Sequence, residues 1–139
     1  MKNPHGLALL SANECQVLLS ANSVGRLAVV VDGEPAIYPV NYVIDGTDIV
    51  LRTNWSGLTH GCPMVIAFEV DGIDIARGCG WSVLVQGMAH DVTDALDVRS
   101  ETLQSVAVLP WVPGPEPRLL RLVPRRTTGQ HFAERALGC

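Results

Sequence analysis

The residues best suited to bind an anion lie where a short apolar segment ends, in the stretch VLRTNWSGLTHG. Arg52 and Thr53 close the apolar segment, and a polar loop that contains Gly57 follows them. An arginine presents a planar pair of N–H donors to a phosphate or carboxylate, and hydroxyls and backbone N–H groups of an adjoining loop add further donors. The pattern is typical of an anion-binding loop, and an ordinary connection between two strands has the same composition.

Other side chains with catalytic potential are scattered. The four histidines show no spacing typical of metal ligands, and the four cysteines form no CxxC pair. Glu69 and Asp71 are expected on one face of a strand, where such a pair is more commonly solvated or paired with an arginine than catalytic. There is no P-loop, dinucleotide-binding fingerprint, GxSxG or HExxH motif. The sequence therefore predicts no metal site and identifies no catalytic side chain.

The composition is that of a compact soluble domain. Hydrophobic residues make up 47% of the 139 residues and charged residues 17%, and the net charge is −4. The acidic balance argues against nucleic-acid binding, and no apolar run approaches the roughly 20 residues of a membrane helix. We expect a cytoplasmic protein with reduced cysteines. Arginines crowd the last quarter of the chain, which fits either a solvated face or an anion site; they are Arg118, Arg121, Arg125, Arg126 and Arg135.

The elements that would position these residues are mostly strands. Ser11–Asn22 is predicted to be a helix, because Ser11 and Glu14 form a capping-box pattern, and Val17, Leu18 and Leu19 are expected to be buried. Strands joined by Asp-Gly turns follow. The six predicted strands are Val24–Val31, Ala36–Ile44, Asp48–Thr53, Pro63–Asp71, Gly80–Val92 and Arg118–Pro124.

Two further features complete the prediction. Gly87, inside a long strand, indicates a bulge or bend, and Thr93 is placed to cap a second helix that reaches about Val106. Six antiparallel strands and two helices in a chain of this length predict a single-domain, mainly β protein, spanning residues 1–139, built around a small closed barrel.

Several segments together resemble the pyridoxamine 5′-phosphate oxidase-like flavoproteins, in their short actinobacterial-type form. The matching segments are VGRLAVV, IYPVNYVIDG, IVLRT, VIAFEVD, GWSVLVQGMAHDV, PW and TTGQ, from about Val24 to Gln130. The resemblance implies a six-stranded antiparallel split barrel. It also implies a homodimer with flavin mononucleotide (FMN) held between the subunits, and an oxidoreductase that acts on a small-molecule substrate the sequence does not identify.

The resemblance also implies where the cofactor would bind. The PVNYV strand would run along the flavin ring, through Pro39, Val40 and Asn41. The RT strand end and its loop would take the phosphate. The GWSVLV strand and the PW segment would help to close the site. The implied phosphate contacts are Arg52, Thr53, Ser56, Gly57 and Leu58, and the closing residues are Trp81, Ser82 and Trp111.

The loop after Arg52 departs from the family pattern R-T-x-x-G-T-K-L. Ser56 stands in the position of the glycine, Gly57 in that of the threonine and Leu58 in that of the lysine. Losing one charge-assisted hydrogen bond to a phosphate costs about 1.5–3 kcal/mol, or one to two decades of affinity. Three readings follow: an FMN-dependent oxidoreductase, a barrel that binds deazaflavin or haem instead, and a non-catalytic cofactor-binding or interaction protein.

Overall fold

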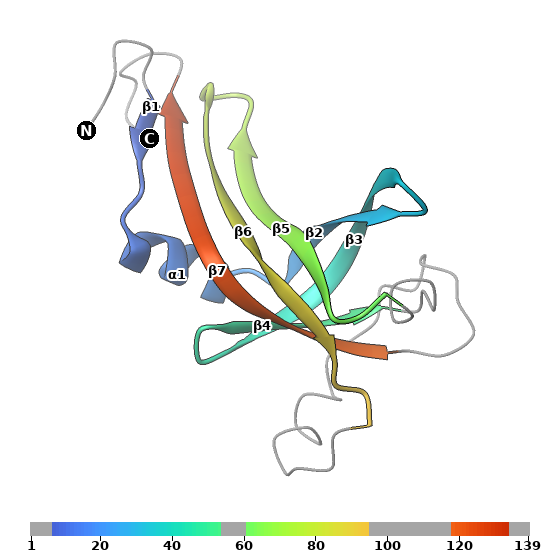
Figure 1. The fold of residues 1–139 in the computed structure, drawn as a ribbon. Coiled ribbons are helices and arrows are strands. Elements are labelled where there is room, and N and C mark those ends of the chain that lie inside the picture. Colours follow the sequence, from blue (N-terminus) through green and yellow to red (C-terminus); the bar gives the residue numbers. More distant parts are fainter. Residues whose placement is uncertain (1–6, 54–60, 95–117, 134–139) are drawn as a thin grey trace.

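The computed structural model describes residues 7–53, 61–94 and 118–133. Seven strands and one helix occupy these ranges (Figure 1). They are β1 (Leu7–Leu9), α1 (Ala12–Ser20), β2 (Val24–Val31), β3 (Glu34–Asp45), β4 (Asp48–Thr53), β5 (Met64–Asp74), β6 (Cys79–Asp91) and β7 (Arg118–Ala133). None of the helices in these ranges has the length and hydropathy of a transmembrane segment.

The strands form one antiparallel sheet that closes on itself. Their order is β1-β7-β4-β3-β2-β5-β6, and β6 also pairs with β7. Strands β2 to β7 therefore make the predicted six-stranded split barrel. The short strand β1, which the sequence did not predict, adds to β7 through the register pair Leu7 and Phe132. Six expected strands are confirmed, and the seventh is an addition at the edge.

Turn chemistry explains the β2–β3–β4 meander. Asp32 and Gly33 join β2 to β3 with φ values of 51° and 79°, and Gly46 joins β3 to β4 with φ 66°. These positive φ values are those that Asp-Gly turns supply at little steric cost. The predicted hairpins are confirmed, and they set Asn41 of β3 opposite Arg52 of β4.

The barrel interior is packed with aliphatic and aromatic side chains. Tyr42 and Phe68 meet edge to face, with ring centroids 4.9 Å apart. Gly25 lies against the Phe68 ring so closely that a Cβ at this position would overlap it. The ring thus occupies the space that a side chain on β2 would take.

Helix α1 packs on this core. The capping box is present, because the Ser11 hydroxyl accepts from the Glu14 N–H and the Glu14 carboxylate accepts from the Ser11 N–H. Cys15 and Leu19 are buried, whereas Val17 is 63% exposed, so the expected burial of Val17 is wrong. Residues four positions apart lie on the same face of a helix, whereas consecutive apolar residues point to different faces.

Strand β7 is longer than predicted. It runs on from Pro124 to Ala133 and bends along the molecule (Figure 1). The register with β6 shifts between Gln86 and Gly87, which confirms the predicted bulge. A Cβ on Gly87 would overlap the Val123 carbonyl, so the close approach of the two strands requires a glycine.

Two other expectations concern Cys79 and Thr93. Cys79 takes part in a disulfide, so the expectation that all cysteines are reduced is wrong. Thr93 lies in a turn, and its hydroxyl accepts a hydrogen bond from the Leu119 N–H at 2.9 Å. The rest of the predicted second helix lies outside the described residues.

Candidate functional site

The first group of predicted cofactor residues gathers at the end of β4. Asn41 and Arg52 are directly opposite each other, so their side chains share the outward face of the sheet. Pro39 precedes Asn41 by two residues on β3, so the two side chains lie on the same face. Pro39 itself lies outside the part of β3 that pairs with β4. Val40 and Thr53 are buried, each 3% exposed, and face the barrel interior. Only their backbone groups are available on the outward side.

The second group lies on β6. Ser82 faces outward, opposite Asp71 of β5 on one side and Gln130 of β7 on the other. Trp81 has the opposite orientation and packs against the core cluster. A Cβ on Gly72 would lie 2.5 Å from the indole nitrogen of Trp81, so the ring covers the β5 backbone there.

Within this chain the two groups lie beside opposite ends of β7. Arg52 pairs with Leu119 near the start of β7, whereas Trp81 pairs with His131 near its end. The twelve residue steps from Leu119 to His131 correspond to about 40 Å of extended strand, and the curvature of β7 makes the direct distance shorter. The structure therefore brings Pro39, Asn41 and Arg52 together and separates them from Trp81 and Ser82. The remaining predicted contacts, Ser56, Gly57, Leu58 and Trp111, lie outside the described residues.

A cluster of charged side chains lies on the outward face of β2 and β5. Arg26 is 3.1 Å from the carboxylate of Asp71 and 3.8 Å from that of Glu69. Of the two non-catalytic alternatives, solvation and pairing with an arginine, the structure shows the second. Burial, a hydrogen bond with Asp71 and the charge of Asp71 raise the pKa of Glu69 to about 7, against the lowering effect of Arg26. Glu69 thus titrates near neutral pH.

Two of the crowded arginines stabilise the sheet. Arg121 bridges Asp45 at 2.9 Å and Asp48 at 3.2 Å across the β3–β4 turn. Arg118 contacts Asp91 at 2.7 Å. Burial opposes ionisation of Asp91, but hydrogen bonds from Thr93 and Arg118 outweigh it and lower the Asp91 pKa.

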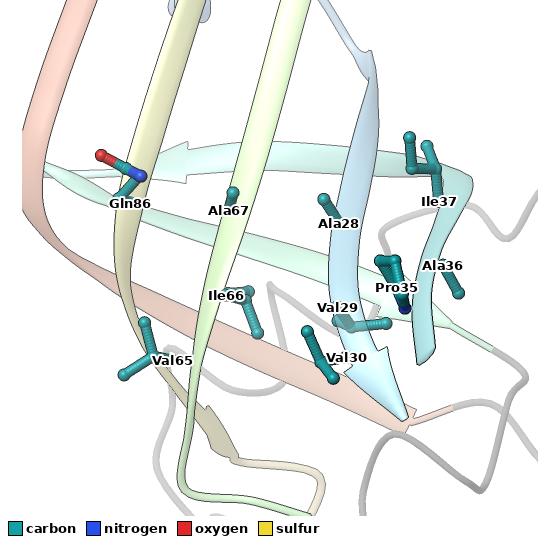
Figure 2. A pocket seen from close by; sticks show the side chains of 10 residues that line it. All are labelled: Ala28, Val29, Val30, Pro35, Ala36, Ile37, Val65, Ile66, Ala67 and Gln86. Carbon is teal, nitrogen blue, oxygen red and sulfur yellow. The ribbon is translucent and has the colours of Figure 1, made fainter. Parts of the chain in front are cut away.

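An apolar groove of about 340 Å³ crosses the outward face of four neighbouring strands (Figure 2). Val30, Ile37 and Val65 on this face are 61%, 69% and 63% exposed. The groove is lined by Ala28, Val29, Val30, Pro35, Ala36, Ile37, Val65, Ile66, Ala67 and Gln86. This surface was not predicted from the sequence. The pattern that indicates it is the apolar residues at every second, outward-facing position of β2 and β5. A sheet face exposed to solvent would carry polar residues there.

The chain is similar to known proteins over nearly its whole length. A family model described as pyridoxamine 5′-phosphate oxidase matches residues 11–131. The FAD binding protein from Mycobacterium smegmatis is 31% identical, with a TM-score of 0.70, covering 90% of this chain and 99% of its own. A Corynebacterium diphtheriae protein of unknown function is 28% identical, with a TM-score of 0.73 and coverage of 92% and 99%. The comparison with curated proteins gives no match.

A third similar structure also matches over nearly its whole length. A Corynebacterium glutamicum protein, provisionally named a pyridoxamine 5′-phosphate oxidase, is 28% identical with a TM-score of 0.72. The match covers 96% of this chain and 97% of that protein. The family model matches residues 11–131, which is most of the chain. The chain belongs to the pyridoxamine 5′-phosphate oxidase family.

Proposed function

We propose that the protein is a flavin-binding oxidoreductase that acts on a small molecule, with FMN as its cofactor. The observation that carries this proposal is the outward pair Asn41 and Arg52 at the end of β4. The sequence that follows resembles the phosphate loop of the family. The 31% identity to a protein described as FAD binding supports a flavin over other cofactors and makes FAD the first alternative to FMN.

The described residues fit a flavin in chemical terms. Arg52 would give the phosphate two N–H donors in a fixed geometry. Asn41 offers both a donor and an acceptor to the polar edge of the ring, and Pro39 offers an apolar surface beside it. When bound, the flavin supplies the electron-transfer chemistry. The chain's own residues then bind and orient the cofactor and exclude water from it.

We propose further that the working form is a homodimer with the cofactor at the subunit interface. Two observations support this. The apolar groove on the outward face leaves Val30, Ile37 and Val65 exposed, and a second copy is the commonest cover for such a surface. One protomer also holds Arg52 and Ser82 at distant points of the barrel, so a site that uses both needs two copies.

Dimerisation is tested by sedimentation velocity on the wild-type protein and on Val65→Glu. We expect a dimer at micromolar concentration and a monomer for the variant, because a charge in the groove would be desolvated on association. Ile75→Glu is the control, since Ile75 is 90% exposed and lies outside the groove. A monomeric wild-type protein would refute this part of the proposal.

Flavin binding is tested by titrating the purified protein separately with FMN, FAD, deazaflavin and haem, and following absorbance. We expect saturable FMN binding that Arg52→Ala weakens by about 10- to 100-fold, the effect of one charge-assisted contact. Arg77→Ala is the control, because Arg77 is an exposed arginine paired with Asp74 at the end of β5. Binding of deazaflavin or haem alone would mean that the altered loop accompanies a different cofactor.

A further inference from the structure

A second groove, more polar than the first, lies on the outward face of β6 and β7. Its volume is about 270 Å³. Three register pairs of β6 and β7 place side chains on this face: Ser82 with Gln130, Leu84 with Thr128, and Gln86 with Arg126. The groove is lined by Leu9, Ser82, Leu84, Arg126, Thr128, Gly129 and Gln130. A guanidinium, two hydroxyls and a carboxamide thus line one surface beside two leucines.

Arg126 differs from the other arginines of β7 in its neighbours. Arg118 and Arg121 each contact carboxylates, at 2.7 Å and 2.9 Å at the nearest. No carboxylate among the described residues lies within ion-pair distance of Arg126 or of its neighbour Arg125. Arg125 falls at the bulge, where the pairing passes from Arg126 to Pro124, and it does not line the groove. Arg126 is therefore the cation that the groove offers to a ligand.

We propose that the groove formed by Ser82, Arg126, Thr128 and Gln130 binds an oxyanion, the phosphate or carboxylate group of a small-molecule ligand. Guanidinium pairs with such groups in a two-point geometry, and hydroxyl and amide donors complete the coordination of the oxygens. Leu9 and Leu84 provide an apolar wall for the rest of the ligand. The groove lies within one protomer, so the inference does not depend on dimerisation.

Among the described residues, two acidic side chains on the neighbouring strand β5 face the same side as the groove, and they do little to repel an anion. Glu69 and Asp71 lie one strand away on the same face, opposite Leu84 and Ser82. Asp71 is ion-paired with Arg26. Burial keeps part of the Glu69 population protonated at neutral pH, because it raises the pKa to about 7. Neither Glu69 nor Asp71 therefore presents a full, unpaired negative charge to the groove at neutral pH.

The test is a titration of the full-length protein with inorganic phosphate at constant ionic strength, followed through the backbone amide signals of Ser82, Thr128 and Gln130. We expect saturable shifts at these amides, and about 10- to 100-fold weaker binding in Arg126→Gln. Arg125→Gln removes the same charge from the adjacent residue and should change the affinity by less than about threefold, the effect of a screened charge. Both arginines are exposed, and thermal unfolding checks that the variants remain folded.

Equal affinity in Arg126→Gln and the wild type, or phosphate shifts confined to residues outside the groove, would overturn the proposal. Titrations with FMN and with phosphate-free riboflavin identify the source of the anion. If Arg126→Gln weakens binding of FMN but not of riboflavin, the groove holds the cofactor phosphate. If binding of both is unchanged while inorganic phosphate binds more weakly, the oxyanion belongs to the substrate. The phosphate titration gives its answer even if no flavin binds.

Discussion

Replacing Glu69 by glutamine is predicted to stabilise the protein at alkaline pH and to have little effect at acidic pH. The pKa of this carboxyl rises from 4.5 to about 7 in the folded protein. A raised pKa means that the fold favours the protonated form. The associated stability is fully present below pH 4.5 and is lost as the pH rises through 7. Glutamine resembles the protonated carboxyl, so Glu69→Gln keeps this stability at every pH.

The magnitude follows from the shift and the exposure of the side chain. A change from 4.5 to about 7 corresponds to an upper limit of about 3 kcal/mol. The Glu69 side chain is 30% exposed, so solvent screening reduces the expected effect to about 1 kcal/mol. Arg26 remains paired with Asp71 in the variant, so no cation loses its only partner.

The assay is urea unfolding of the wild type and the variant at several pH values from about pH 4 to about pH 8, where linkage predicts the difference to develop. Glu34→Gln is the control, since Glu34 is exposed and lies outside the cluster. Carbon-13 NMR of the Glu69 carboxyl measures the pKa directly. A pKa below 5, or a stability difference that is the same at all pH values, would refute the reasoning.

Three further predictions concern packing and ion pairs. Gly129→Ala should destabilise the protein by about 1–3 kcal/mol in urea unfolding, because the new Cβ would lie 2.5 Å from the Cys15 sulfur; if Cys15→Ala does not partly restore the loss, the contact is not the cause. Tyr42→Phe should lower the free energy of unfolding by about 1–3 kcal/mol in the same assay, because the buried Tyr42 hydroxyl donates a hydrogen bond to the Leu19 carbonyl at 2.6 Å. Asp91→Asn should destabilise the protein at neutral pH and not at pH values below the lowered Asp91 pKa, where the wild-type carboxyl is itself protonated; equal destabilisation in acid would count against this.

Most of the barrel could be predicted because its local signals agree with its tertiary structure. Runs of β-branched residues correctly predicted the strands, Asp-Gly pairs predicted the turns, and Gly87 predicted the bulge. The strand β7 was predicted to end at Pro124, where proline removes a ladder donor. Instead Pro124 lies at the register shift with β6, so the strand continues through it.

The expectations that were wrong concern positions whose structure depends on tertiary packing and not on the local sequence. A three-residue strand such as β1 carries too little pattern to be recognised, and it forms because β7 offers an edge. The exposure of Val17 depends on which face of α1 meets the barrel. In both cases the local sequence admits more than one arrangement.

The candidate site was predictable in its parts and not in its arrangement. The family resemblance assigned Asn41 and Arg52 to one site, and the short β3–β4 hairpin sets them opposite each other. The distance between Arg52 and Ser82 follows from how β4 and β6 each pair with β7, which is a property of barrel closure. The apolar groove likewise arises from neighbouring strands that the sequence alone does not order.

The most direct test of the central claim is an FMN titration of the purified wild-type protein alongside Arg52→Ala, with Arg77→Ala as the charge-matched control. The account predicts saturable binding, retained in the control and weakened about 10- to 100-fold in Arg52→Ala. A folded wild-type protein that binds neither FMN nor FAD would contradict it, as would full FMN affinity in Arg52→Ala.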